Sequence, residues 1–375
     1  MRIETFGVEE WMNLWEDSAT WNIAETCVES LTVRELLEMT GDSGSQIDAF
    51  LNKKLTYGHI FGAPELLNGI ASLYHQQRAE NILPAHGGIG ANQLALQTLI
   101  EPGDEVIVVV PTYQQLQSLP AALGATVILY KLSPEEGFLP VPEKLEALIT
   151  KKTRALIMNN PNNPTGAHMD ETLLKEIVAL CRRSGIWLYC DEVYRGLEHS
   201  GSFQTPSVVD LYEKAVATSS FSKVFSLAGL RLGWIVGGEA FIERCKKWRD
   251  YGTISCGVLD EWLGGIAIKE KDRILARNLD LLNHNAIILD DWMRRQSKLS
   301  YVKPRAGTTA FLKFENTEIK SEPFCLDLLK KTGAFLTPGS RFPGWEGWLR
   351  IGYAPQTKVL ETGLDKLEEM LLKQS

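Results

Sequence analysis

Short apolar runs alternate with amphipathic segments through the middle of the chain, and this alternation restricts the fold more than any other feature. Residues 171–184, for example, repeat apolar side chains at helical spacing. Alternating strands and helices indicate βαβ units and a mainly parallel sheet. Because right-handed crossovers bring the strand C-terminal ends to one edge, ligand-binding residues are expected there. The runs predicted to be strands buried on both faces are 105–110, 126–130, 155–158 and 186–189.

The pattern changes after about residue 255, where longer helical stretches predominate. A length of 375 residues also favours two domains. We therefore predict an α/β fold in which a large domain over 47–265 has a mainly parallel sheet flanked by helices. The N-terminal arm, 1–46, and the C-terminal third, 266–375, are predicted to form a smaller α+β domain. The later predicted elements are helices over 269–293, 322–331 and 357–372 and a strand over 308–314.

Composition and charge exclude several classes of function. A net charge of -8 argues against a nucleic-acid surface, which needs clustered Lys and Arg. Apolar runs stay below the roughly 18 residues of a membrane span, and the start of the sequence differs from a signal peptide. The six cysteines lack a CxxC pair and the six histidines lack metal-site spacing. These features predict a cytoplasmic enzyme without a bound metal.

Residues 219–234, SSFSKVFSLAGLRLGW, place one lysine among hydroxyl-bearing and apolar residues. A lysine desolvated beside other cations is easier to deprotonate and attacks carbonyls, so a Schiff base to an aldehyde cofactor is the predicted use. The S-x-S-K-x7-R pattern resembles the pyridoxal-phosphate attachment site of class I/II aminotransferases, the fold-type-I group related to aspartate aminotransferase. The resemblance implies that Lys223 binds pyridoxal phosphate covalently. Ser220 and Arg231 would bind its phosphate, with Ser222 in the same site.

Two further segments match the cofactor site of this family. HGGIGAN, residues 86–92, precedes a helical segment at 93–100, and glycines at a helix N-terminus suit an anion. By resemblance Gly88 and Ile89 offer their backbone N–H groups to the phosphate, although the family more often has Ser or Thr there. Tyr113 directly follows the strand at 105–110, where the family places an aromatic ring over the pyridine face.

Two motifs with polar side chains lie at other predicted strand ends. NNPNNPTG, residues 159–166, resembles the N-P-x-N-P-[TS]-G signature, which implies that Asn163 bonds the cofactor's phenolic oxygen and helps to hold the substrate carboxylate. A cis bond is expected at Asn163–Pro164. In YCDEVYR, Asp191 matches the carboxylate that keeps the pyridine ring protonated, and Tyr194 matches the tyrosine that bonds the phenolic oxygen.

Three residues are candidates for the substrate and for a partner subunit. Arg350, inside the apolar run GWLRIGYA, needs a carboxylate partner, and by resemblance it grips the substrate α-carboxylate. Glu25 belongs to the N-terminal arm and is either a partner for a cationic substrate group or a solvated glutamate. Tyr57 resembles the tyrosine that reaches the phosphate of the neighbouring subunit, which implies a homodimer with shared active sites.

These residues together predict an aminotransferase that exchanges an amino group between an L-amino acid and a 2-oxo acid by a ping-pong mechanism. Lys223 is the expected general base, assisted by Asp191 and Tyr194. An alternative is a pyridoxal-phosphate-dependent lyase or cyclase, because the sequence around RDYGTIS, PGSRF and LRIGYA resembles the capreomycidine-synthase-like branch most closely. A regulator of this fold with a DNA-binding head is disfavoured, since the chain begins close to the fold.

Overall fold

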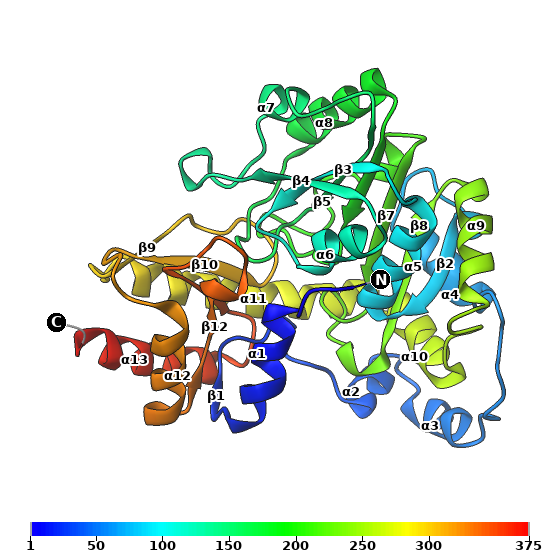
Figure 1. The fold of residues 1–375 in the computed structure, drawn as a ribbon. Helices are drawn as coiled ribbons and strands as arrows, with labels where there is room; N and C mark the ends of the chain where they lie inside the picture. Colours follow the sequence, from blue (N-terminus) through cyan, green and yellow to red (C-terminus); the bar gives the residue numbers. More distant parts are fainter. Residues whose placement is uncertain (1, 374–375) are drawn as a thin grey trace.

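The computed structural model describes residues 2–373, and Figure 1 shows a large sheet with helices beside a smaller region in which blue and orange-to-red segments meet. The α-helices are α1 (Gly7–Trp15), α2 (Val33–Glu38), α3 (Ser43–Leu51), α4 (Pro64–Ala71), α5 (Gly87–Leu99), α6 (Gln115–Ala122), α7 (Pro142–Glu146), α8 (Glu171–Ser184), α9 (Glu239–Arg249), α10 (Val258–Lys269), α11 (Lys271–Met293), α12 (Ser321–Thr332) and α13 (Thr357–Leu372). The strands are β1 (Trp21–Asn22), β2 (Ile82–His86), β3 (Glu105–Val110), β4 (Thr126–Lys131), β5 (Thr153–Asn159), β6 (Trp187–Asp191), β7 (Ala215–Ser220), β8 (Leu232–Gly237), β9 (Leu299–Tyr301), β10 (Thr309–Phe314), β11 (Ala334–Phe335), β12 (Thr337–Pro338) and β13 (Trp348–Gly352).

The large sheet has seven strands in the order β2-β8-β7-β6-β5-β3-β4. The pairs from β4 to β7 are parallel, whereas β8 pairs antiparallel with both β7 and β2. This arrangement confirms the predicted α/β class with a mainly parallel sheet. It also places the carboxyl ends of β3, β5, β6 and β7 along one edge.

Both faces of the sheet are covered, as β3 illustrates. Its sequence EVIVVV sends alternate side chains to opposite faces. Val106, Val108 and Val110 join the apolar cluster that includes α5 and α9, whereas Ile107 and Val109 join the cluster that includes α8. β3 can therefore consist almost entirely of β-branched residues, because neither of its faces is exposed to water.

The prediction that residues 126–130 are buried on both faces is wrong. β4 is the edge strand of the large sheet, and of its residues only Tyr130 is buried. An edge strand has a neighbour on one side alone, so its side chains are covered less than those of β3. The apolar composition of the two runs is similar, and composition alone does not distinguish the edge from the centre.

Helix α8 shows how local sequence fixes the connecting helices. Asp170 caps its N-terminus by accepting a hydrogen bond from the Leu173 N–H, and Gly185 ends it with φ of 68°. Its buried residues recur at helical spacing and pack on the sheet. The predicted bounds of α8 and α13 are confirmed, and those of α11, α12 and β10 are confirmed to within two residues.

The N-terminal arm packs against the C-terminal third of the chain. β1 pairs in parallel with β11, and a second sheet of order β12-β13-β10-β9 lies beside them. In Figure 1 the blue α1 and β1 lie next to the orange α12 and β12. The domain limits at residues 46/47 and 265/266 stay a prediction. Among residues 2–373, no helix combines the length and apolar character needed to cross a membrane.

Candidate active site

The carboxyl ends of the parallel strands and the N-terminus of α5 border a cavity of about 340 Å³. This volume lies within the range of about 300–1,000 Å³ that is usual for small-molecule sites. The N-terminal arm closes the cavity from the opposite side. Every predicted site residue except Tyr57 lines it: Glu25, Gly88, Ile89, Tyr113, Asn163, Asp191, Tyr194, Ser220, Ser222, Lys223, Arg231 and Arg350.

Lys223 follows β7 and its side chain is 20% exposed, toward the cavity. Its Nζ donates to Thr26 Oγ1 at 2.5 Å and to Cys27 Sγ at 3.2 Å, and it lies 3.8 Å from Glu25 Oε1. Burial opposes the ammonium form, but Cys27, Tyr194 and Glu25 raise the pKa of Lys223 above its ordinary value. The expectation that neighbouring cations ease its deprotonation is wrong, because its neighbours are acidic or neutral groups.

Asp191 ends β6 and is buried at the base of the cavity. Its carboxylate accepts hydrogen bonds from Asn92 Nδ2 at 2.8 Å and from the Val193 N–H at 3.0 Å. Asn92 is oriented in turn by Tyr189 and Thr218, whose hydroxyls lie 2.7 Å and 2.5 Å from its Oδ1. Burial raises the pKa of Asp191, and because both donors are neutral, a cation in the cavity would stabilise its charged form.

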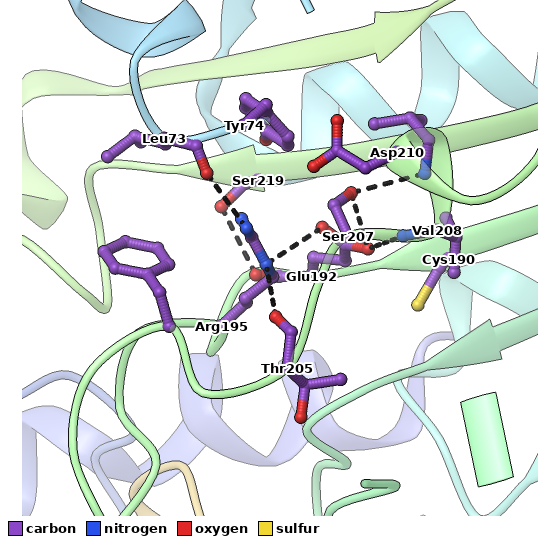
Figure 2. A network of polar contacts seen from close by, with 12 residues as sticks. Leu73, Tyr74, Cys190, Glu192, Arg195, Thr205, Ser207, Val208, Asp210 and Ser219 are labelled. Carbon is purple, nitrogen blue, oxygen red and sulfur yellow. Dashed lines mark hydrogen bonds and ion pairs between the residues drawn. The ribbon is translucent and has the colours of Figure 1, made fainter. Parts of the chain in front are cut away.

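Figure 2 shows a buried polar network around Glu192 and Arg195, which belong to the same segment as Asp191 and Tyr194. Glu192 accepts hydrogen bonds from Ser207 Oγ and from the Val208 N–H, both at 2.9 Å. Arg195 donates to the carbonyl oxygens of Leu73, at 2.9 Å, and Thr205, at 3.2 Å, and lies 3.9 Å from the Glu192 carboxylate. These bonds tie Glu192 and Arg195 to two other segments, one at Leu73 and one at 205–208, and so hold the backbone between Asp191 and Arg195 in place.

The N-terminus of α5 forms the end of the cavity that suits a phosphate. The helix begins at Gly87, so the glycines form its first turn and not a loop before a helix at 93–100. Within the described chain, no side chain caps this end, which leaves the first N–H groups free for an anion. Gly87 has φ of 68°, and a Cβ there would lie 2.8 Å from Arg231 Nη2. A glycine therefore lets the guanidinium approach the helix end.

Asn163 and Arg350 meet at the opposite end of the cavity. Arg350, in β13, is 3% exposed and donates to Asn163 Oδ1 at 3.4 Å and to Ala24 O and Thr337 Oγ1, both at 3.1 Å. Its Nε has no hydrogen-bond partner among residues 2–373. A buried guanidinium that lines a cavity and keeps an unpaired donor suits a carboxylate ligand. The expected cis bond at Asn163–Pro164 is confirmed, and Val110–Pro111 and Asn160–Pro161 are also cis.

Several residues at the site were missed by sequence reasoning. Thr26 and Cys27 contact Lys223 directly, and Asn92 orients Asp191. Glu9, on α1, accepts a hydrogen bond from the Tyr113 hydroxyl at 2.8 Å, which fixes that ring at the cavity wall. Glu16 lines the cavity as well. Tyr57, in contrast, is 68% exposed and lies outside the cavity.

The residues present fit pyridoxal phosphate. The α5 N-terminus, Ser220 and Arg231 would hold the phosphate, and Asp191 would face the ring nitrogen. Lys223 and Arg350 line the same cavity, so a substrate carboxylate would bind at Arg350 beside the cofactor. The phosphate end is open in the single chain, where Ile89 is 41% exposed.

Comparisons with known proteins find related sequences and structures along nearly the whole chain. The family model described as aminotransferase class I and II matches residues 45–367. Capreomycidine synthase from Streptomyces vinaceus is 29% identical over 368 residues, covering 97% of this chain and 93% of that protein. Aspartate aminotransferase from Pyrococcus horikoshii is 27% identical over 318 residues, covering 83% and 81%. The crystal structure of a PLP-dependent aminotransferase from Streptococcus suis superposes with a TM-score of 0.95 at 39% identity, covering 100% and 99%.

Proposed function

Because the chain belongs to the aminotransferase class I and II family, whose members depend on pyridoxal phosphate, we propose that it transfers an amino group from an L-amino acid to a 2-oxo acid. The observation that carries this proposal is the placement of Lys223, Asp191 and Arg350 around one cavity. Lys223 is positioned for an aldehyde, Asp191 for a ring cation and Arg350 for a carboxylate. We assign the remaining lining residues the cofactor and substrate contacts predicted from the sequence.

When bound, pyridoxal phosphate supplies an aldehyde for the substrate amine and a ring that takes up electrons from the substrate Cα. Lys223 Nζ would act as the general base that accepts the Cα proton of the substrate. Thr26 and Cys27 keep this amine in place through their hydrogen bonds. Asp191 balances the positive charge of the ring nitrogen, and Arg350 orients the α-carboxylate through its two parallel donors.

The test of this function is to add a panel of L-amino acids to the holoenzyme and to record the absorbance of the cofactor together with released ammonia. We expect the aminated form of the cofactor to accumulate without ammonia, and a 2-oxo acid to restore the original spectrum. Ammonia release that accompanies each turnover would contradict transamination and would indicate elimination.

A cyclase is the second candidate, because capreomycidine synthase matches 97% of the chain. A cyclising enzyme needs the same cofactor site, since the proton at Cα must also be removed. It differs in what happens afterwards, because a leaving group such as hydroxide departs from Cβ and a nucleophile of the substrate's own side chain then adds there and closes the ring. Mass spectrometry of the products from the same panel would reveal a cyclic amino acid, which transamination does not produce.

We also propose a homodimer in which a second copy covers the phosphate end of the cavity. Two contacting segments carry exposed apolar side chains, namely Leu55, Tyr57 and Phe61 in one and Trp248 and Tyr251 in the other, the last 92% exposed. The Arg249 guanidinium lies 5.3 Å from the Phe61 ring centroid, so the segment with Trp248 and Tyr251 contacts the segment with Tyr57 and Phe61. Burying such a patch between copies is favourable.

Sedimentation velocity is expected to give about twice the chain mass of 41.9 kDa. The variant Tyr57→Phe is expected to weaken cofactor binding several-fold, because it loses one hydrogen bond to the cofactor phosphate of the other copy. The control is Tyr301→Phe, because Tyr301 bonds Asp290 away from the cavity. A monomer with full cofactor affinity would contradict both the dimer and the shared site.

A further inference from the structure

Three carboxylates of the N-terminal arm line the cavity. Glu9 lies on α1, Glu16 begins the 3₁₀ turn that follows it, and Glu25 follows β1. They lie at the same end of the cavity as Arg350. The Arg350 Nη2 donates a hydrogen bond to Ala24 O, next to Glu25, and the Arg350 guanidinium interacts with the charges of Glu25 and Glu9. Burial, then the charge of Glu25 and more weakly those of Asp17 and Glu9, raise the pKa of Glu16. The three carboxylates therefore favour a positive charge beside them, which would offset the burial and repulsion that raise the pKa of Glu16.

The protein's own cations do not supply that counter-charge once the proposed ligands are bound. Among the described residues that line the cavity, the cations are Lys223, Arg231 and Arg350. The cofactor phosphate occupies Arg231, and the substrate α-carboxylate occupies Arg350. Lys223, which lies 3.8 Å from Glu25 in this structure, forms the bond to the cofactor.

The hydrogen bonds of the arm carboxylates also leave them without a cationic partner. Glu9 Oε1 accepts from the Tyr113 hydroxyl, and Glu16 Oε1 accepts from Asn22 Nδ2 at 3.0 Å. Both donors are neutral, so each stabilises one oxygen of its carboxylate but does not neutralise the negative charge of Glu9 or Glu16. The negative end of the α1 dipole lies at Trp15, beside Glu16, and adds to the attraction for a cation.

The same face of the arm provides apolar contacts between these charges. Val8 and Met12 line the cavity one helical turn apart, and Glu16 comes one further turn along. This order suits a substrate side chain whose methylene groups pack against Val8 and Met12 and whose positively charged end reaches Glu16. An aspartate or glutamate side chain would bring a fourth negative charge to the arm.

We propose that the substrate is an amino acid whose side chain is a methylene chain ending in an ammonium or guanidinium group, which Glu9, Glu16 and Glu25 bind while Arg350 binds the α-carboxylate. The inference rests on the proposed function, because that function assigns Arg350 and Lys223 their partners. The buried Arg350, which has an unpaired Nε and lines the same cavity, independently indicates that a ligand with a carboxylate binds beside these residues.

Calorimetry on the holoenzyme tests the charge preference without cofactor chemistry. The two ligands are 5-guanidinopentanoate and 5-ureidopentanoate, which lack an amine and differ in the charge of the terminal group. We expect the guanidino ligand to bind about tenfold more tightly or better, the usual effect of a charge-assisted bond in a partly buried site. Glu16→Gln and Glu9→Gln should each reduce this ratio, whereas Glu361→Gln, at an exposed carboxylate of α13 outside the cavity, should preserve it. Equal affinities in the wild type would overturn the inference.

Cofactor absorbance separates this inference from the proposed function. L-Arginine and L-lysine are expected to change the spectrum at concentrations about tenfold lower than L-citrulline and L-norleucine, their neutral counterparts. If all four act at equal concentrations, the function stands and the cation preference is wrong. If none changes the spectrum although the guanidino ligand binds selectively, the cation site stands and the proposed function is wrong.

Discussion

Lys223→Ala is expected to lower turnover of the amino-acid substrate by at least about 10⁴-fold, because it removes both the covalent attachment point and the general base. The phosphate contacts of α5, Ser220 and Arg231 remain, so the variant should still bind pyridoxal phosphate, with the absorbance of the free aldehyde. Stopped-flow measurement of cofactor absorbance after addition of substrate would report both properties.

The control for this variant is Lys151→Ala, which removes an exposed lysine from the turn before β5. Its turnover should equal that of the wild type. Wild-type turnover in Lys223→Ala would exclude Lys223 from the chemistry. Loss of folding would be seen as a lowered Tm, and that loss is not expected, since the Lys223 amine lies at a cavity and not in the apolar core.

Arg350→Gln is expected to lower kcat/KM about 100-fold or more, mainly through a higher KM for both the amino acid and the 2-oxo acid. Removing one partner of a buried charge pair costs about 2–5 kcal/mol, and about 1.4 kcal/mol corresponds to a factor of ten. Arg350→Lys keeps the charge but loses the two parallel donors, so an intermediate value is expected. Steady-state kinetics with the best substrate of the panel would measure both.

Arg341→Gln is the matched control for Arg350, because Arg341 pairs with Glu10 and Glu322 outside the cavity. It should alter Tm more than KM. An unchanged KM in Arg350→Gln would show that the free Nε of Arg350 is not a carboxylate site. An equal loss in both variants would point to a structural effect of removing either arginine.

The parts of the site that the sequence predicted are those in which a motif directly follows a strand. Asp191 ends β6, Asn163 comes four residues after β5, and Lys223 comes three after β7. A parallel sheet brings such positions together, so their assembly follows from the strand order. Because the sheet brings the strand ends together, Asn163, Asp191 and Lys223 line one cavity although they are far apart in sequence.

The residues that the sequence did not predict depend on contacts between distant segments. Asn92 reaches Asp191 across 99 residues, and Glu9 reaches Tyr113 across 104. Neither contact leaves a local signal, because a helical Asn and a helical Glu are ordinary. The start of α5 was missed for another reason. Glycines are poor helix formers, but Gly87 begins α5 with φ of 68° and a Cβ there would lie 2.8 Å from Arg231 Nη2, so the local geometry selects glycine at that position.

Borohydride reduction of the holoenzyme, followed by peptide mass mapping, tests the central claim most directly. Reduction makes the bond between the cofactor and its lysine permanent, so the modified peptide identifies the residue. We expect one reduced pyridoxyl group per chain, on the peptide that contains Lys223, and its loss in Lys223→Ala. A label on another lysine, or an unlabelled protein, would contradict the assignment of this cavity as a pyridoxal-phosphate site.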